Sequence, residues 1–381
     1  MKRCLFIATC FTSLNSFSQD IAFGRKMVDT LTASTFWGRG YTNDGMQKAA
    51  DFLAGQFQSF GLQPMKGKDF LQPFSYPVNT FPGKMELSIN GKDLVPGKDF
   101  IVSPDCKGVK GKGNFVQADS VQFVNRDNAF IVVLEDKLTW SVAGQQAGYS
   151  VVLVDKKAVS NPSSFKVNIE NRLINEFKTA NVCGMVKGTV KPDSIILVSA
   201  HYDHLGGMGK DTYFPGANDN ASGVALLLNL ARYYAANPQP YSIGFICFAG
   251  EEAGLVGSKY FTEHPLVPLK NIRFLTNTDL AGTGEEGITV VNATEFPNEF
   301  AMMNAINKEH QLLAAINARG KAANSDHYHF TEKGVPAFFF YTLGGIKAYH
   351  DVFDKPATLP LTEHEDLFKL IVKFNEKLMG K

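Results

Sequence analysis

The chain has 381 residues, of which 44% are hydrophobic and 20% are charged, and its formal net charge is +1. This composition is typical of a globular protein, and the length allows one large domain or two modest ones. The balanced charge shows no basic stripe, which excludes nucleic acid as an expected partner, and no apolar run in the body of the chain is long enough to span a membrane.

The N-terminus has the features of a secretory signal peptide. A basic segment at residues 1–3 precedes the mostly apolar residues 4–17, and small residues at Ser16 and Ser18 are typical of a cleavage site after Ser18. A frayed helix is the alternative. We expect residues 1–18 to be removed and the mature protein to be secreted or periplasmic.

Two amphipathic helices are expected at the start of the mature chain. Apolar residues recur at helical spacing from Asp20 to Leu31, and again from about Asp44 to Phe60. Gly61 directly follows the second pattern and is a typical helix stop.

The composition changes over residues 77–175, which are rich in Gly, Lys, Asn, Asp and Val. Short alternating runs and the hairpin signal Asn90-Gly91 predict strands in this part of the chain. We expect an inserted β-rich domain at 77–175, within a main domain formed by residues 19–76 and 176–381. The alternative is that these strands extend the main sheet.

Apolar runs and helical patterns alternate from about residue 181 onward. Continuous apolar strands that alternate with helices indicate a mostly parallel central sheet with helices on both faces, an α/β fold. Ligands of such sheets bind outside the carboxyl ends of the strands. Strands are predicted at 195–200, 243–249, 274–280, 288–292 and 337–341, and helices at 221–236, 254–264, 297–313 and 361–379.

Side chains that bind metals lie at or near the ends of these strands. In chain order they are His201, Asp219, Glu251, Glu252, Asp279 and His350. Carboxylates neutralise divalent cations, and imidazoles suit zinc. A water that bridges two such ions becomes a hydroxide near neutral pH. The order and the strand-end positions of the set therefore predict a two-metal hydrolytic site.

Individual members of this set also have simpler explanations. Asp219 is of a type common at helix N-caps, and the adjacent Glu251 and Glu252 repel each other and suit a solvated turn. Asp279 lies inside an apolar run, where an unpaired carboxylate is costly, so a nearby cation is favoured.

Three further residues are predicted to support the site. Asp203 is placed to accept a hydrogen bond from the second imidazole nitrogen of His201. Tyr349 precedes His350 and offers a hydroxyl to a developing oxyanion. Asp326 receives a supporting role, because it lies in a polar cluster with two histidines.

Four motifs together resemble those of the co-catalytic di-zinc aminopeptidases, a family that includes bacterial leucyl aminopeptidases and relatives of glutamate carboxypeptidase and the transferrin receptor. They are His201-Tyr-Asp-His204, Gly216-Ala-Asn-Asp-Asn-Ala-Ser-Gly223, Glu251-Glu-Ala-Gly-Leu-Val-Gly-Ser258 and Tyr349-His350. The resemblance covers roughly residues 20–75 and 180–381. Residues 77–175 are loosely similar to a protease-associated domain.

The resemblance implies a zinc exopeptidase-like fold, two Zn²⁺ ions (or other divalent transition metals) and peptide substrates with a free N-terminus. It implies that N-terminal residues are hydrolysed with a metal-bridged hydroxide and Glu251 as general base. At matching positions, the resemblance implies that His201 and Asp279 hold one zinc ion and that Glu252 and His350 hold the other. Asp219 would bridge the two ions. Tyr349 would donate to the oxyanion, and Asp203 would be the hydrogen-bond partner of His201.

Three alternatives remain open at this stage. A carboxypeptidase or dipeptidase on the same scaffold needs a basic residue for a substrate carboxylate, and Arg319 and Lys321 are available. Glutaminyl cyclase-like chemistry uses a single zinc on this fold. A non-catalytic binding protein would have kept the fold without turnover.

Overall fold

A nine-stranded sheet forms the centre of the part of the chain that this computed structural model describes, residues 20–380. The strand order is β1-β12-β16-β13-β17-β20-β18-β19, and β2 also pairs with β12. The predicted signal peptide at 1–18 lies outside the described residues. The strands are β1 (Gln63–Pro64), β2 (Leu71–Thr80), β12 (Arg172–Val186), β13 (Lys191–His201), β16 (Tyr241–Phe248), β17 (Ile272–Thr278), β18 (Ile288–Val291), β19 (Ile316–Ala318) and β20 (Ala337–Thr342).

The four middle strands, β16, β13, β17 and β20, run parallel to one another. They are built from the apolar runs that the sequence predicts as strands, and their side chains are buried on both faces. Towards the edges the direction changes, because β12 pairs antiparallel with β16, and β18 with β20. The predicted α/β sheet is confirmed, with a parallel centre and antiparallel margins.

Helices cover both faces of this sheet. One face packs against α1, α2, α3, α5 and α7 in the largest apolar cluster, and the other against α4 and α6 through Phe261 and Phe330. Asp20 caps the first helix by accepting a hydrogen bond from the Phe23 N–H at 2.9 Å. The helices are α1 (Ile21–Leu31), α2 (Gly45–Phe60), α3 (Gly223–Ala236), α4 (Val256–Glu263), α5 (Pro297–His310), α6 (His327–Glu332) and α7 (His364–Leu378).

The helix boundaries differ from prediction by a few residues, for identifiable reasons. Leu255 has a φ of +60°, so α4 begins after it rather than at Gly254. Gln311 has a φ of +50°, which ends α5 before residue 313. The short helix α6 was not predicted, because its six residues are too few to show a helical period in the sequence.

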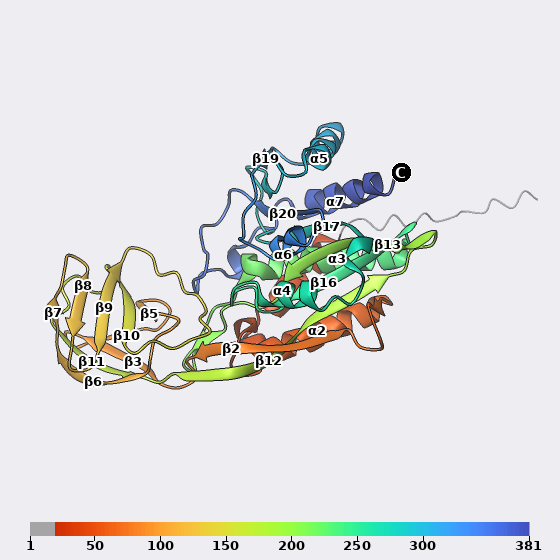
Figure 1. Ribbon diagram of the computed structural model, residues 1–381. Helices are drawn as coiled ribbons and strands as arrows, with labels where there is room; N and C mark the ends of the chain where they lie inside the picture. The colour runs from red at the N-terminus through yellow and green to blue at the C-terminus, as the bar shows by residue number, and fades with distance from the viewer. Residues whose placement is uncertain (1–19, 381) are drawn as a thin grey trace, which may run out of the picture.

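Residues 85–169, called the β-rich region below, form two smaller sheets at one end of the molecule (Figure 1). The long strands β2 and β12 connect them to the central sheet, and the predicted limits 77 and 175 fall inside these two strands. We propose that the region is an inserted domain. Its strands are β3 (Met85–Ile89), β4 (Lys92–Leu94), β5 (Phe100–Val102), β6 (Val109–Asn114), β7 (Val116–Gln117), β8 (Gln122–Asn125), β9 (Phe130–Glu135), β10 (Ser150–Asp155) and β11 (Ser164–Ile169).

The hairpin predicted at Asn90-Gly91 is present between β3 and β4. Apolar side chains from both small sheets, among them Phe100, Phe130 and Phe165, form a cluster of their own. Among the described residues, no helix combines the length and the apolar character that crossing a membrane requires.

Candidate active site

The carboxyl ends of the parallel strands bring the predicted metal ligands into one cavity of about 440 Å³. Strand β13 ends at His201, β16 leads into Glu251 and Glu252, and β17 leads into Asp279. The cavity is lined by all the predicted ligands and by both predicted catalytic residues, namely His201, Asp219, Glu251, Glu252, Asp279, Tyr349 and His350. Asp203 and Asp326 are buried behind its wall.

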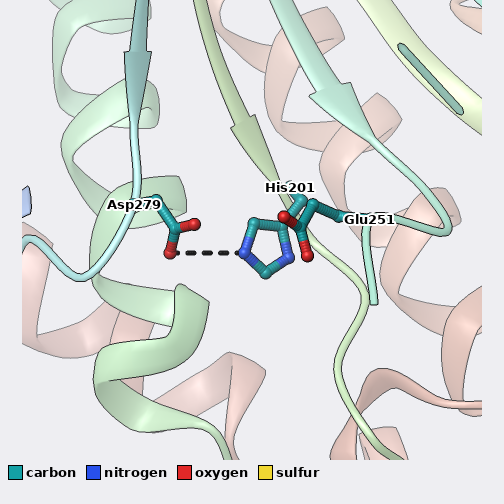
Figure 2. Close-up of side chains that lie close together, drawn as sticks. All are labelled: His201, Glu251 and Asp279. Atoms are coloured by element: carbon teal, nitrogen blue, oxygen red, sulfur yellow. Dashed lines mark ion pairs between the residues drawn. The ribbon is translucent and has the colours of Figure 1, made fainter. Parts of the chain in front are cut away.

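His201, Glu251 and Asp279 form the first group of possible metal ligands (Figure 2). One ligand atom of each residue lies within 4.8 Å of the others. Nε2 of His201 is 3.3 Å from Oδ1 of Asp279, an oxygen that is buried and has no hydrogen-bond partner among the described residues. The group therefore presents one imidazole and two carboxylates towards the same point.

Asp219 lies between this group and the second histidine. Its Oδ1 is 3.4 Å from Nε2 of His201, and its Oδ2 is 3.0 Å from Nε2 of His350. Nε2 of His350 is also 3.2 Å from Oε2 of Glu252. The two oxygens of one carboxylate thus face two different imidazoles, the orientation that a bridging ligand needs.

His204 is a site residue to which sequence reasoning gave no role. Its Nδ1 lies 2.7 Å from Oε1 of Glu252 and 3.9 Å from Oδ1 of Asp219, and these three residues form a second group of possible metal ligands. The ring is fully buried. Because Glu252 meets His204 with one oxygen and His350 with the other, its carboxylate is fixed from both sides. The sequence feature that could have predicted a site role for His204 is the spacing His201-x-x-His204 directly after a strand.

Asp203 acts on more of the site than predicted. Its carboxylate accepts hydrogen bonds from the backbone N–H groups of Glu251 at 3.1 Å and Glu252 at 3.3 Å. The nearest acceptor to Nδ1 of His201 is the backbone carbonyl of Asp203 at 3.1 Å, while the carboxylate lies at 3.7 Å. The same residue therefore orients one imidazole and holds the turn that carries both glutamates.

The loop that carries Asp219 is fixed by buried polar contacts. The carboxylate of Asp354 accepts from the N–H groups of Asn218 at 2.8 Å and Asp219 at 3.0 Å. Gly216 has a φ of +60°, and a Cβ there would lie 2.4 Å from the ring of His204, so only glycine fits. Helix α3 begins at Gly223, which leaves Asp219 too far away to be its N-cap.

Burial and neighbouring charges shift the pKa values across the site. Burial lowers the pKa of His350, but Glu252 and Asp219 overcome this and raise it to about 11. Burial likewise opposes the charge on His201, yet Asp279 and Glu251 raise its pKa well above the usual range. Burial raises the pKa of Glu251 well above its ordinary value. The site therefore favours positive charge strongly.

These shifts have one physical origin, since four carboxylates converge on the cavity. Within residues 20–380, histidines are the only basic groups whose nitrogens lie within 4.0 Å of Asp219, Glu252 and Asp279, and no basic group lies that close to Glu251. Buried carboxylates without compensating cations are costly. A set of imidazole nitrogens and carboxylate oxygens of this kind fits zinc or a related divalent ion.

The remaining predicted residues line or support the cavity. Tyr349 is 42% exposed, and its ring stacks on that of His350 with centroids 4.0 Å apart. Asp326 precedes α6, and burial raises its pKa to about 7 although His201 opposes this. Arg319 lines the cavity and donates to the Tyr341 hydroxyl at 3.2 Å, whereas Lys321 pairs with Glu332 elsewhere.

Comparison with known proteins identifies relatives at the level of sequence. The profile of Peptidase family M28 matches residues 181–375, just over half of the chain. A probable zinc metalloprotease of Pyricularia oryzae is 34% identical over 150 residues, which cover 38% of this chain and 30% of that protein. Aminopeptidase YwaD of Bacillus subtilis is 27% identical over 257 residues, 64% of this chain and 55% of that protein. The chain thus spans about a third to a half of the length of these relatives.

Solved structures share the fold along nearly the whole chain. BSAP, a zinc aminopeptidase from Bacillus subtilis, has a TM-score of 0.70 at 18% identity, covering 94% of this chain and 95% of that one. The Peptidase M28 precursor from Shewanella amazonensis has a TM-score of 0.71 at 16% identity, covering 94% and 93%. These structures share the fold, and the match over residues 181–375 shows that this chain belongs to Peptidase family M28.

Proposed function

We propose that this chain is a secreted zinc-dependent aminopeptidase. The observation that carries the proposal is the position of Asp219, whose two oxygens face His201 and His350 separately. A single-metal site does not need a carboxylate between two imidazoles, whereas a site for two ions does. The names of the relatives, an aminopeptidase and a probable zinc metalloprotease, support the same reading.

The residues present fit two zinc ions. His201 and Asp279 would hold one, Glu252 and His350 would hold the other, and Asp219 would contact both. When bound, the two cations would polarise the scissile carbonyl and lower the pKa of a water molecule to near neutrality. His204 would hold the second oxygen of Glu252 and so orient it.

Glu251 is the proposed general base. It lines the cavity beside His201 and Asp279, and Asp203 holds the backbone of the turn that carries it. Burial raises its pKa well above the ordinary value, which suits a group that accepts a proton from water and later gives it to the leaving amine.

Tyr349 is the proposed donor to the oxyanion. Burial, together with Asp219 and Glu252, raises its pKa above the ordinary value, so the hydroxyl keeps its proton. The ring is held by stacking on His350 and lines the cavity. A neutral hydroxyl at this place can donate to a carbonyl oxygen as negative charge develops on it.

We propose peptides with a free α-amine as substrates. Four carboxylates line the cavity, and the charge of the two proposed zinc ions would balance theirs, so charge alone does not select a free N-terminus. The proposal is supported by the name of one relative, an aminopeptidase.

Exchanging each glutamate for glutamine in turn tests these roles. Glu251→Gln should retain two zinc ions per chain and lose nearly all turnover, because only the proton acceptor is removed. Glu252→Gln should lose zinc as well as turnover. Zinc content and hydrolysis of leucine p-nitroanilide distinguish the two variants. Full activity of Glu251→Gln would refute the assignment of the base, and bound zinc without turnover in the wild type would favour a binding role.

A dipeptidase remains a second candidate because of Arg319. It is the only Lys or Arg side chain among the residues that line the cavity, and no carboxylate lies within 4.0 Å of it in the described part of the chain. Its guanidinium is therefore available to a substrate carboxylate. Arg319→Gln, with Lys321→Gln as the matched control, should slow cleavage of Leu-Gly but not of Leu-Gly amide if this candidate is correct.

A further inference from the structure

A segment of the β-rich region reaches the loop that carries His350. Trp140 lies between β9 and β10, some 210 residues before His350 in the chain. Its backbone N–H donates to the His350 carbonyl oxygen at 2.9 Å, and its own carbonyl oxygen lies 2.8 Å from Nδ1 of His350. Only an N–H can donate to a carbonyl, so Nδ1 of this imidazole carries a proton.

This contact determines how His350 faces the cavity. A metal ligand must be a neutral imidazole, and a proton on Nδ1 then leaves the lone pair on Nε2, the atom that lies 3.0 Å from Asp219 and 3.2 Å from Glu252. A ligating imidazole needs this arrangement, with an acceptor behind one nitrogen and the metal before the other. Here a backbone carbonyl of the β-rich region supplies the acceptor.

Trp140 is itself fixed within the β-rich region. Its indole N–H donates to the carbonyl oxygen of Val102, the last residue of β5, at 2.9 Å. Its ring stacks on Phe214 with centroids 4.7 Å apart, and only 5% of the residue is exposed. The position of its carbonyl is therefore set by Val102 of the β-rich region and by Phe214 of the loop after β13.

The loop around His350 needs such support. His350 has a φ of +53°, a conformation that costs free energy for a residue with a side chain. Lys137, three residues before Trp140, also contacts this loop. Its Nζ donates a hydrogen bond to the Lys347 carbonyl oxygen at 3.1 Å and lies 3.8 Å from Oδ2 of Asp351. The contacts of Trp140 and Lys137 come from the same segment of the β-rich region.

The β-rich region is docked firmly enough to transmit this support. Leu205, Met208 and Phe214, which follow β13, lie in its apolar cluster rather than in the cluster of the main sheet. Phe81, at the end of β2, also pairs with Met208 in an isolated bridge. These contacts hold the region in one position relative to the loops of the site.

We infer that the β-rich region completes the metal centre, with Trp140 as a positioning residue whose backbone carbonyl orients the ligand His350. The inference rests on the proposed function for the identity of the ions. It assigns the region a part in metal binding, in addition to any effect on substrate access through Ser141, which lines the cavity.

Zinc affinity measured by competition with a chromophoric chelator tests the inference on the full mature chain. Trp140→Ala removes the indole anchor and should weaken one of the two zinc sites by about 10- to 100-fold, leaving the other within about twofold. Trp140→Phe keeps the stacking on Phe214 but loses the bond to Val102, so its effect should be smaller. Lys137→Ala, a surface change that leaves the core intact, should also weaken one site.

Phe130→Ala is the matched control, because it empties the core of the same region away from His350. It should lower the melting temperature without changing either zinc affinity. Unchanged affinities in both Trp140→Ala and Lys137→Ala would overturn the inference, as would an equal loss at both sites in Phe130→Ala. If the wild type binds fewer than two zinc ions, the proposed function fails instead, and this outcome is visible before any variant is made.

Discussion

Arg39 is a fully buried cation whose removal should damage both stability and the site. Its guanidinium donates five hydrogen bonds, all to backbone carbonyls, at 2.7 to 3.2 Å. The acceptors belong to the segments that carry the predicted ligands, since they include Tyr202, Gly216 and Asp219. One residue thus ties the loop after β13 to the loop that carries Asp219.

The expected magnitude follows from these five bonds. A buried carbonyl that loses its donor costs about 1 to 3 kcal/mol, which gives an upper range of about 5 to 15 kcal/mol for Arg39→Met. Burial lowers the pKa of Arg39 to about 10, so relief of this burial cost offsets part of the loss. We expect Arg39→Met to lose about 4 kcal/mol of unfolding free energy. Arg39→Lys retains at most three donors and should lose about half as much.

Urea denaturation of the zinc-free protein measures this change, and zinc competition measures the effect on the site. Arg39→Met should bind zinc at least about tenfold more weakly, because Asp219 and the loop after His201 lose a common support. Arg25→Met is a suitable control, since Arg25 also donates to backbone carbonyls but lies near the surface, away from the cavity. A loss below about 1 kcal/mol in Arg39→Met, with zinc affinity unchanged, would refute the reasoning.

Three further outcomes are expected. Tyr349→Phe keeps the ring on His350 but lacks the hydroxyl, so kcat for leucine p-nitroanilide should fall by about 10²- to 10³-fold with little change in KM, and an unchanged kcat would exclude an oxyanion role. Removing zinc with a chelator should lower the melting temperature by about 5 to 10 °C, reversed by adding zinc, whereas a metal-independent protein would show no shift. Burial lowers the pKa of His364 to about 4, so unfolding takes up a proton between about pH 6.5 and 4, and stability should fall by about 3 kcal/mol over that range. The slope of unfolding free energy with pH should therefore be smaller in His364→Gln, and an equal slope would show that this histidine is not buried neutral.

The sequence was sufficient to predict the central sheet and the polar side chains that gather at its edge. Apolar runs long enough to be buried on both faces mark β13, β16, β17 and β20, and strand ends in a parallel sheet lie side by side. That geometry explains how polar residues as far apart in the chain as His201 and His350 line one cavity. The roles of individual ligands are still predictions.

The residues that hold the site could not be predicted, because their partners are backbone groups or residues far away in the chain. Arg39 lies between the two predicted N-terminal helices, and its acceptors are carbonyls, which every residue carries. Trp140 contacts His350 through its main chain, so its side chain gives no signal of this role. His204 is the last residue of the motif His201-Tyr-Asp-His204, but only the folded chain brings it to Glu252.

Asp203 illustrates the limit of arguments from spacing. Its position two residues after His201 predicts contact with that imidazole, and the backbone carbonyl of Asp203 makes the closest one. Its carboxylate accepts hydrogen bonds from the N–H groups of Glu251 and Glu252. No sequence pattern links these two residues to Asp203. Spacing thus located the residue near the site, while the fold decided what each of its oxygens accepts.

The most direct test of the account is hydrolysis of leucine p-nitroanilide by the zinc-loaded mature protein, measured beside its N-acetylated counterpart. The account predicts cleavage of the free-amine substrate only, with loss of activity on chelation. Cleavage of both substrates would contradict an aminopeptidase and favour an endopeptidase or a broader amidase. Cleavage of neither would contradict the proposed activity and give weight to the dipeptidase, cyclase and binding alternatives.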